Sequence, residues 1–456
     1  MSGASLVAAT VVFLTGCVLV WLGHRPFGEV LRWVAIAAFA TQAARRRTLT
    51  PWIFVAMIAG AELGFDAPHF AVHLRVFSDI FLRLIKTIVA PLIFAMLVTG
   101  IAGHADLKSV GRMGIKSLVY FEVLTTLALV IGLAAINLTK AGVGLVVPAD
   151  IAANQTLTGV APTHWDEFLL HIFPENIAKS VAEGQVLQVA VFAVLFGIAL
   201  AGLSQARRAP VLNLCESLGE VMFKFTNIVM YFAPIGVGGA MAYTVGNMGL
   251  GVLVNLGKLL LTFYGALTAF ALLVLLPVAL IARVPIRRFL KVVADPATIA
   301  FATANSEAAL PRAMEAMEAL GVPRRIVAFV IPAGYSFNLD GSTLYLALAS
   351  VFVAQAAGRH MSWGEQLLMM VTLMLTSKGV AGVSRASLVV LLGTLATFHL
   401  PTEPVFVILG IDALMDMART MINVVGNCLA SVVIAQWEGQ FGVEAPSPAV
   451  VEGMAE

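Results

Sequence analysis

One apolar segment near the C-terminal end of the chain carries a regular series of polar residues. Residues 404–435 are almost wholly apolar, and polar residues interrupt them at intervals of 4, 3, 4 and 4. Such intervals keep side chains on one face of an α-helix, so they predict a single polar stripe. The members of the stripe are Asp412, Asp416, Arg419, Asn423 and Asn427. A charge at the centre of a membrane helix costs about 2.5 to 3.5 kcal/mol on insertion scales, so the stripe must face protein or water.

Two residues of the stripe suggest which ligand it holds. The guanidinium of Arg419 is a planar fork that can bind a carboxylate through two hydrogen bonds, and the carboxylate of Asp416 can accept an ammonium group. One helical turn apart, they match the opposite ends of a zwitterion that has an extra carboxylate. The alternative is an internal salt bridge between Asp416 and Arg419, although a buried pair is weak evidence for stability.

A second polar group lies within an otherwise apolar stretch, at Gly334–Ser342. Its Asn, Asp, Gly and Ser residues loosen a helix and leave carbonyl oxygens beside the carboxylate of Asp340. Oxygen ligands of this kind suit a hard cation or a proton. The alternative is a helix kink at Gly341 with a packed Asp340.

The composition indicates a polytopic helical membrane protein. Hydrophobic residues make up 60% of the chain and charged residues 12%, and the mean hydropathy is +0.94. A soluble domain usually has roughly 25% charged residues. The net charge of +2 argues against a nucleic-acid partner, and the three cysteines lack the paired spacing of a disulfide framework or zinc site. We therefore expect a multi-pass protein of the cell inner (plasma) membrane, with the lipid bilayer as its surroundings and no cofactor or metal centre.

Nine segments are candidates for crossing a bilayer core about 30 Å thick. They are Ala4–Leu22, Pro51–Gly64, Val76–Ile101, Ser117–Leu138, Val186–Leu203, Leu214–Tyr243, Leu250–Ala282, Ile326–Ala356 and Pro404–Ala435. A shorter run, Val30–Ala44, is doubtful. The first segment is read as a retained helix because no basic residue precedes it, and cleavage as a signal peptide is the alternative. Arg45–Arg47 place the start of the following segment on the cytoplasmic side.

Two regions break this pattern in the same way. In Phe289–Leu320 and Trp363–Leu400, apolar arms of about 10 to 13 residues flank a centre of small and polar residues. Arms this short cannot cross a bilayer, so each region reads as a re-entrant hairpin whose tip stops near the midplane. Each hairpin precedes a long helix with polar residues, which indicates a repeat and a transporter's binding site.

Four ordered motifs resemble one family of membrane transporters. They are Thr303–Pro311, Asn338–Ser342, Ser377–Gly382 and Asp416–Asn427. Together they resemble the dicarboxylate/amino acid:cation symporters, the glutamate transporter family, over about Pro51 to Trp437. The resemblance implies an all-α polytopic membrane protein of eight transmembrane helices and two re-entrant hairpins with inverted repeats. It also implies a homotrimer that works as an elevator.

The same resemblance divides the chain into a scaffold and a moving transport domain. Residues 1–50 precede the family's usual start and are expected to form one or two extra helices. The scaffold comprises 51–116 (helices 1 and 2) and 139–249 (a loop with helices 4 and 5). The transport domain comprises 117–138 (helix 3) and 250–437 (helix 6, hairpin 1, helix 7, hairpin 2 and helix 8). Residues 438–456 are a C-terminal tail.

Site residues are carried over from the family position by position. The side-chain carboxylate of an acidic amino acid would be held by Arg419 and Thr420 with Ser342, its amino group by Asp416 and its α-carboxylate by Asn423. Ser306 and the backbone around Val383 and Ser387 would close the site from the two hairpin tips. The residues implied in ion or proton coupling are Glu122, Glu307, Gly334, Asn338, Asp340, Asn423 and Asn427.

Departures from the family pattern suggest the coupling ion and the substrate. Sodium-coupled members usually carry Asp at the position of Asn427 and Met at that of Leu339, whereas Glu122 and Glu307 resemble the bacterial proton/glutamate branch. A buried Glu can hold a proton near neutral pH because desolvation raises its pKa. The C4-dicarboxylate branch typically lacks an acid at the position of Asp416. The sequence thus predicts a proton-coupled glutamate/aspartate symporter and no enzyme; a sodium-coupled acidic amino acid symporter and a C4-dicarboxylate symporter are the alternatives.

Overall fold

The computed structural model describes residues 3–46, 49–102, 111–145, 173–182, 186–377, 386–398, 400–401 and 404–442. Every regular element within these ranges is helical, which confirms the predicted all-α class. The first half contains α1 (Gly3–Trp21), α2 (Arg25–Arg46), α3 (Leu49–Asp66), α4 (Pro68–Ala71), η1 (Val72–Leu74), α5 (Arg75–Ala102), α6 (Gly111–Thr139), α9 (Ile177–Ala182), α10 (Val186–Ala201), α11 (Gln205–Met230) and α12 (Ala233–Met248). The second half contains α13 (Gly251–Phe270), η2 (Ala271–Leu275), α14 (Leu276–Ile281), α15 (Ile286–Thr303), α16 (Ser306–Leu320), α17 (Arg324–Phe337), α18 (Asp340–Ala356), α19 (Trp363–Thr376), α20 (Ala386–Thr397) and α21 (Pro404–Trp437).

Six stretches of the described chain are long and apolar enough to cross a membrane. They are Leu49–Asp66, Pro68–Thr99, Met113–Thr139, Gly251–Ile281, Arg324–Ala356 and Val407–Trp437. The helices α11 and α12 together give a seventh if they count as one bent span. The protein is therefore a polytopic membrane protein, and the count of eight spans stays a prediction.

The predicted span Leu214–Tyr243 is divided rather than continuous. It falls into α11 and α12, which meet at an angle of 51°. Pro234 lies in the first turn of α12. Proline lacks the backbone N–H of a helix interior and its ring clashes with the carbonyl four residues earlier, so the α-helix breaks just before it.

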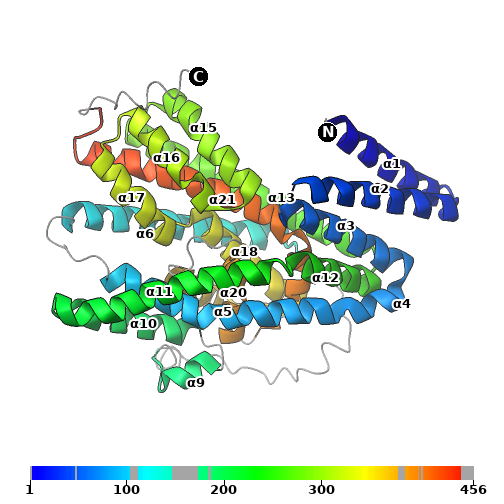
Figure 1. Cartoon of the computed structure of the whole chain (residues 1–456), viewed down its shortest axis with the longest axis horizontal. Coiled ribbons are helices and arrows are strands. Elements are labelled where there is room, and N and C mark those ends of the chain that lie inside the picture. Colours follow the sequence, from blue (N-terminus) through cyan, green and yellow to red (C-terminus); the bar gives the residue numbers. More distant parts are fainter. Residues whose placement is uncertain are drawn as a thin grey trace.

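The helices pack in two groups that touch (Figure 1). In one group α3 and α5 pack on α12, and α5 also packs on α10 and α11. In the other, α18 packs on α6 and α21, while α15 and α17 also pack on α21. Nearly every side chain of α18 is buried, so this helix lies in the core of the second group. The groups meet where α12 packs on α21 and where α20 packs on α5 and α10.

Within the N-terminal 50 residues the structure has two helices, α1 and α2. The doubtful run Val30–Ala44 lies inside α2. The two helices pack on each other at one end of the molecule, and α2 packs on α3 (Figure 1). Arg32 of α2 is buried and forms ion pairs with Glu62 at 3.2 Å and Asp66 at 2.8 Å, both on α3.

Each interrupted region consists of two short helices that pack on each other. In the first, α15 and α16 are separated at Ala304, whose φ of 50° and ψ of 34° are left-handed and end the helix. In the second, α19 and α20 flank residues 378–385. These residues, which include Val383 and Arg385, lie outside the described residues. The paired short helices agree with the predicted arms of the two regions, while the re-entrant course of each region in the membrane stays a prediction.

Candidate functional site

The polar stripe predicted from spacing lies on the single helix α21 and is buried. The exposed fractions are 0% for Asp412, 4% for Asp416, 2% for Arg419, 4% for Asn423 and 1% for Asn427. Thr420, predicted to act with Arg419, is 5% exposed. A helix that buries three charged residues needs partners for them, and most of those partners lie on α21 itself and on α18.

Arg419 is held between two carboxylates. Its Nε donates to Asp416 Oδ1 at 2.9 Å, and its Nη2 lies 2.7 Å from the same oxygen. Its Nη1 donates to Asp412 Oδ1 at 3.4 Å. The internal ion pair that the sequence left open is therefore present. Because one guanidinium pairs with two carboxylates, the side chains of Asp412, Asp416 and Arg419 together carry a net charge of −1 when all three are ionised.

Tyr345 of α18 completes this cluster, and sequence analysis did not find it. Its hydroxyl donates to Asp412 Oδ1 at 3.1 Å, and Arg419 Cζ lies 4.4 Å from the centre of its ring. Cation–π contacts of this kind are favourable and fix the plane of the guanidinium. Its position in the sequence could have indicated this role. Tyr345 lies one turn after Ser342, on the same face of a helix whose other residues are mostly apolar.

The second polar group lies where the predicted loosened helix breaks. The helix α17 ends at Phe337, and α18 begins at Asp340. Between them Asn338 (φ −122°, ψ 68°) and Leu339 (φ −100°, ψ 59°) leave the helical region. The prediction of an opened helix at this segment is confirmed, and the break lies within the span Arg324–Ala356.

Asn338 connects the break to α21. Its Nδ2 donates to Asn427 Oδ1 at 3.0 Å and to Asp340 Oδ2 at 3.3 Å. Its own Oδ1 and the Nδ2 of Asn427 are buried and have no hydrogen-bond partner among the described residues. A buried amide oxygen without a donor fits a ligand oxygen for a cation or a proton donor, because such groups are otherwise nearly always paired.

Asn423 of α21 caps the first turn of α18. Its Oδ1 accepts hydrogen bonds from the backbone N–H of Gly341 at 2.8 Å and of Ser342 at 3.4 Å. Its Nδ2 donates to Ser342 Oγ at 3.0 Å. The first N–H groups of a helix have no partner within the helix, so a side chain from a neighbouring helix supplies one here. The predicted contact residues Ser342 and Asn423 are thereby brought together.

Close packing between α18 and α21 depends on Gly341 and Gly426. A Cβ atom on Gly341 would lie 2.5 Å from the backbone oxygen of Arg419, and one on Gly426 would lie 2.5 Å from Asp340 Oδ2. No other residue type leaves room for the two helices at this distance. Gly334 faces Asn427 in the same way, since a Cβ there would overlap the amide oxygen.

Three of the remaining predicted residues take no part in the contacts above. Ser306 is half-buried at the start of α16, Ser387 is buried in α20, and Glu122 is half-buried in α6. Glu307 lies in α16, but its side chain is outside the described residues, as is Val383. Among the described residues, no group of three or more His, Cys, Asp or Glu could hold a metal ion.

Comparison with known proteins identifies a family. The profile of the sodium:dicarboxylate symporter family matches residues 49–437. The proton/sodium-glutamate symport protein of Bacillus caldotenax is 42% identical over 400 residues, which cover 86% of this chain and 95% of that protein. The C4-dicarboxylate transport protein of Solibacter usitatus is 43% identical over 401 residues, covering 87% and 94%. The proton/glutamate-aspartate symporter of Escherichia coli is 43% identical over 371 residues, covering 80% and 85%.

Proposed function

Because the chain belongs to the sodium:dicarboxylate symporter family, it is a membrane transporter and not an enzyme, and we propose that it imports glutamate or aspartate together with protons. Relatives of similar identity are named glutamate symporters and C4-dicarboxylate transporters. The choice between these substrates therefore depends on the site.

The observation that carries the proposal is the buried pair of Asp416 and Arg419 on one helix. An acidic amino acid brings a carboxylate for Arg419 and an ammonium group for Asp416. A C4-dicarboxylate brings no ammonium, so it would leave a buried carboxylate facing a second anion, which is strongly unfavourable. An acid at position 416 thus favours amino acids.

The other substrate contacts are proposed from their positions. Thr420 follows Arg419 and would share the side-chain carboxylate with Ser342. Asn423 already presents an amide to Ser342 and would hold the α-carboxylate. Ser306, Ser387 and the backbone at Val383 would approach from the hairpins.

The proposed coupling ion is the proton, carried by Glu122 and Glu307. Asn427 and Leu339 replace a carboxylate and a thioether that would serve sodium. Sodium remains the alternative because Asp340, Asn338 and the backbone around Gly334 offer oxygen atoms near one another, and relatives are named proton/sodium symporters.

We further propose a homotrimer in which each subunit works as an elevator. Residues 117–138 and 250–437 would move together against residues 51–116 and 139–249. Packing supports this division at α6, which lies between scaffold segments in the sequence but packs on α18 and α13.

Uptake into proteoliposomes tests the function. Purified protein would be reconstituted, and labelled glutamate, aspartate and succinate would be offered under a proton gradient, a sodium gradient or neither. We expect glutamate or aspartate to accumulate with the proton gradient alone and the accumulation to collapse with an uncoupler. Uptake that required sodium would overturn the coupling, and preference for succinate would overturn the substrate.

A further inference from the structure

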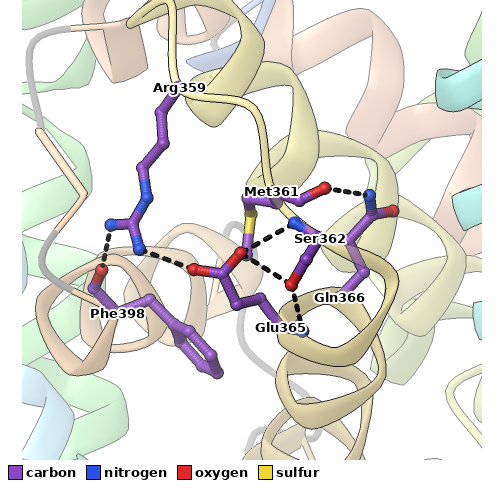
Figure 2. Close-up of polar contacts among 6 residues, drawn as sticks. All are labelled: Arg359, Met361, Ser362, Glu365, Gln366 and Phe398. Atoms are coloured by element: carbon purple, nitrogen blue, oxygen red, sulfur yellow. Dashed lines mark hydrogen bonds and ion pairs between the residues drawn. The ribbon is translucent and has the colours of Figure 1, made fainter. Parts of the chain in front are cut away.

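One arginine joins three helix ends at the base of the second interrupted region. Arg359 lies between α18 and α19, and its guanidinium points at both arms of the helix pair α19 and α20 (Figure 2). Its Nη2 donates to Glu365 Oε1 at 2.9 Å, in the first turn of α19. Its Nη1 donates to the backbone oxygen of Phe398 at 3.0 Å, one residue after the end of α20.

Both acceptors are groups that need a donor. Glu365 forms a capping box with Ser362: it accepts from the Ser362 backbone N–H at 2.7 Å, and its own N–H donates to Ser362 Oγ at 3.3 Å. This fixes the carboxylate at the start of α19. The carbonyl of Phe398 belongs to the last groups of a helix, which have no partner within it. Arg359 therefore bonds to the start of one arm and the end of the other.

Neighbouring amides attach the same junction to α6. Asn137 of α6 donates to Gln366 Oε1 at 2.7 Å. Gln366 in turn donates to the backbone oxygen of Met361 at 3.0 Å, as Figure 2 shows. Gln355, near the end of α18, donates to the backbone oxygen of Ile136 at 3.2 Å. The ends of α6, α18 and α20 and the start of α19 thus meet in one hydrogen-bonded junction.

Two of the residues proposed to bind substrate lie at the opposite ends of these helices. Ser342 is in the first turn of α18, and Ser387 is in the first turn of α20. With 12 residues, α20 is about 18 Å long at 1.5 Å per residue. A tilt of 5° about its far end would therefore move Ser387 by about 1.5 Å, which is enough to lengthen a hydrogen bond of about 2.9 Å beyond hydrogen-bonding distance.

We propose that Arg359 is a positioning residue for substrate binding: by joining the two arms at their base, it sets the position of Ser387 relative to the binding residues of α18. The proposal rests on the proposed function for the role of Ser387. The side chain of Arg359 is 25% exposed and that of Glu365 is 37% exposed. Partly exposed ion pairs contribute little to stability, so removing this one should leave the protein folded.

The test compares Arg359→Gln and Arg359→Lys with a control, Arg312→Gln. Arg312 forms an ion pair with Glu315 on the surface of α16, so its loss removes a similar charge without touching the junction. Full-length protein in proteoliposomes would be assayed for the KM and kcat of uptake and for its melting temperature. We expect Arg359→Gln to raise KM about tenfold, equivalent to 1.4 kcal/mol, with a smaller change in kcat and a melting temperature like that of the control. Arg359→Lys should recover part of the affinity because it keeps one charged donor.

A second readout does not depend on the substrate. Hydrogen exchange of residues 386–398 should be faster in Arg359→Gln than in wild type, while exchange of residues 306–320 should be unchanged. The proposal would be overturned if Arg359→Gln had the same KM and kcat as wild type. It would also be overturned if the changes in Arg359→Gln were equal to those in Arg312→Gln. If wild type carries succinate and not glutamate, the proposed substrate is wrong, and the same comparison of KM made with succinate still decides the role of Arg359.

Discussion

Replacing Arg32 with alanine is expected to destabilise the protein by an amount that can be worked from its surroundings. The side chain of Arg32 is 5% exposed, and those of its partners Glu62 and Asp66 are 10% and 15% exposed. The guanidinium also lies 5.3 Å from the ring centre of Phe65, and Trp33 Nε1 donates to Asp66 Oδ2 at 3.0 Å. Among the described residues, these side chains form the polar contacts between α2 and α3.

Removing one partner of a buried ion pair typically costs about 3 to 5 kcal/mol, because the other charge is left buried without compensation. In Arg32→Ala two carboxylates would be left on α3, four residues apart on one face. Neutralising them at the same time should recover most of the loss, since what remains is roughly one or two hydrogen bonds at about 1 kcal/mol each. The predicted order of stability is wild type, then Arg32→Ala with Glu62→Gln and Asp66→Asn, then Arg32→Ala alone.

The assay is thermal unfolding of detergent-solubilised protein, with the fraction of monodisperse protein after extraction as a second measure. Arg312→Ala, which removes an exposed ion pair, is the control and should stay near wild type. The reasoning is refuted if Arg32→Ala melts like Arg312→Ala, or if the triple variant is no more stable than Arg32→Ala. Either result would mean that the ion pairs do not dock α2 on α3.

Three further predictions concern the site and the hairpin base. Asp416→Ser should raise succinate uptake relative to glutamate by about tenfold or more in competition assays, equivalent to about 1.4 kcal/mol, because succinate brings no ammonium group and puts a second carboxylate beside the buried one of Asp416; an unchanged ratio would contradict the assignment. Gly334→Ala should abolish concentrative uptake, because the added Cβ overlaps the amide oxygen of Asn427, while Gly257→Ala, which meets nothing within 4 Å, should transport normally. Burial acts to raise the pKa of Glu365, but hydrogen bonds from Ser362 and Arg359 outweigh it and lower the pKa. Its ionised form therefore stabilises the fold above its ordinary pKa of about 4.3, and this contribution is lost as the pH falls through the lowered value, so the melting temperatures of wild type and Glu365→Gln should converge in acid.

The sequence predicted features that depend on local spacing. The polar stripe on α21 follows from a helical period, and the break at Asn338 follows from residue types that weaken a helix. The division of Leu214–Tyr243 was also readable, because Pro234 was present within the apolar run. The hydrophobic run alone predicts one continuous span, whereas the proline inside it predicts the break.

Long-range partners could not be predicted from one sequence. Tyr345 meets Asp412 across 67 positions, and Asn423 caps Gly341 across 82. Each residue is polar, but its own segment does not reveal which of several polar residues on another helix it contacts. For Arg32 the sequence gives a partial indication of its partner. Glu62 is an acid within the next apolar segment, and an acid in such a segment needs a positively charged partner.

Buried charge gives a physical reason for coupling the substrate to a cation. When ionised, Asp340, Asp412 and Asp416 carry three negative charges against the single positive charge of Arg419, and all four side chains are buried. An acidic amino acid adds one more negative charge in total. Two unit charges 4 Å apart interact by about 4 kcal/mol at an effective dielectric constant of 20, so each uncompensated charge weakens substrate binding considerably. A proton on a nearby carboxyl group or a cation at the helix break removes one of these charges. At the proposed site, substrate and cation would therefore favour each other's binding, and this positive coupling is what a symporter can use to carry both together.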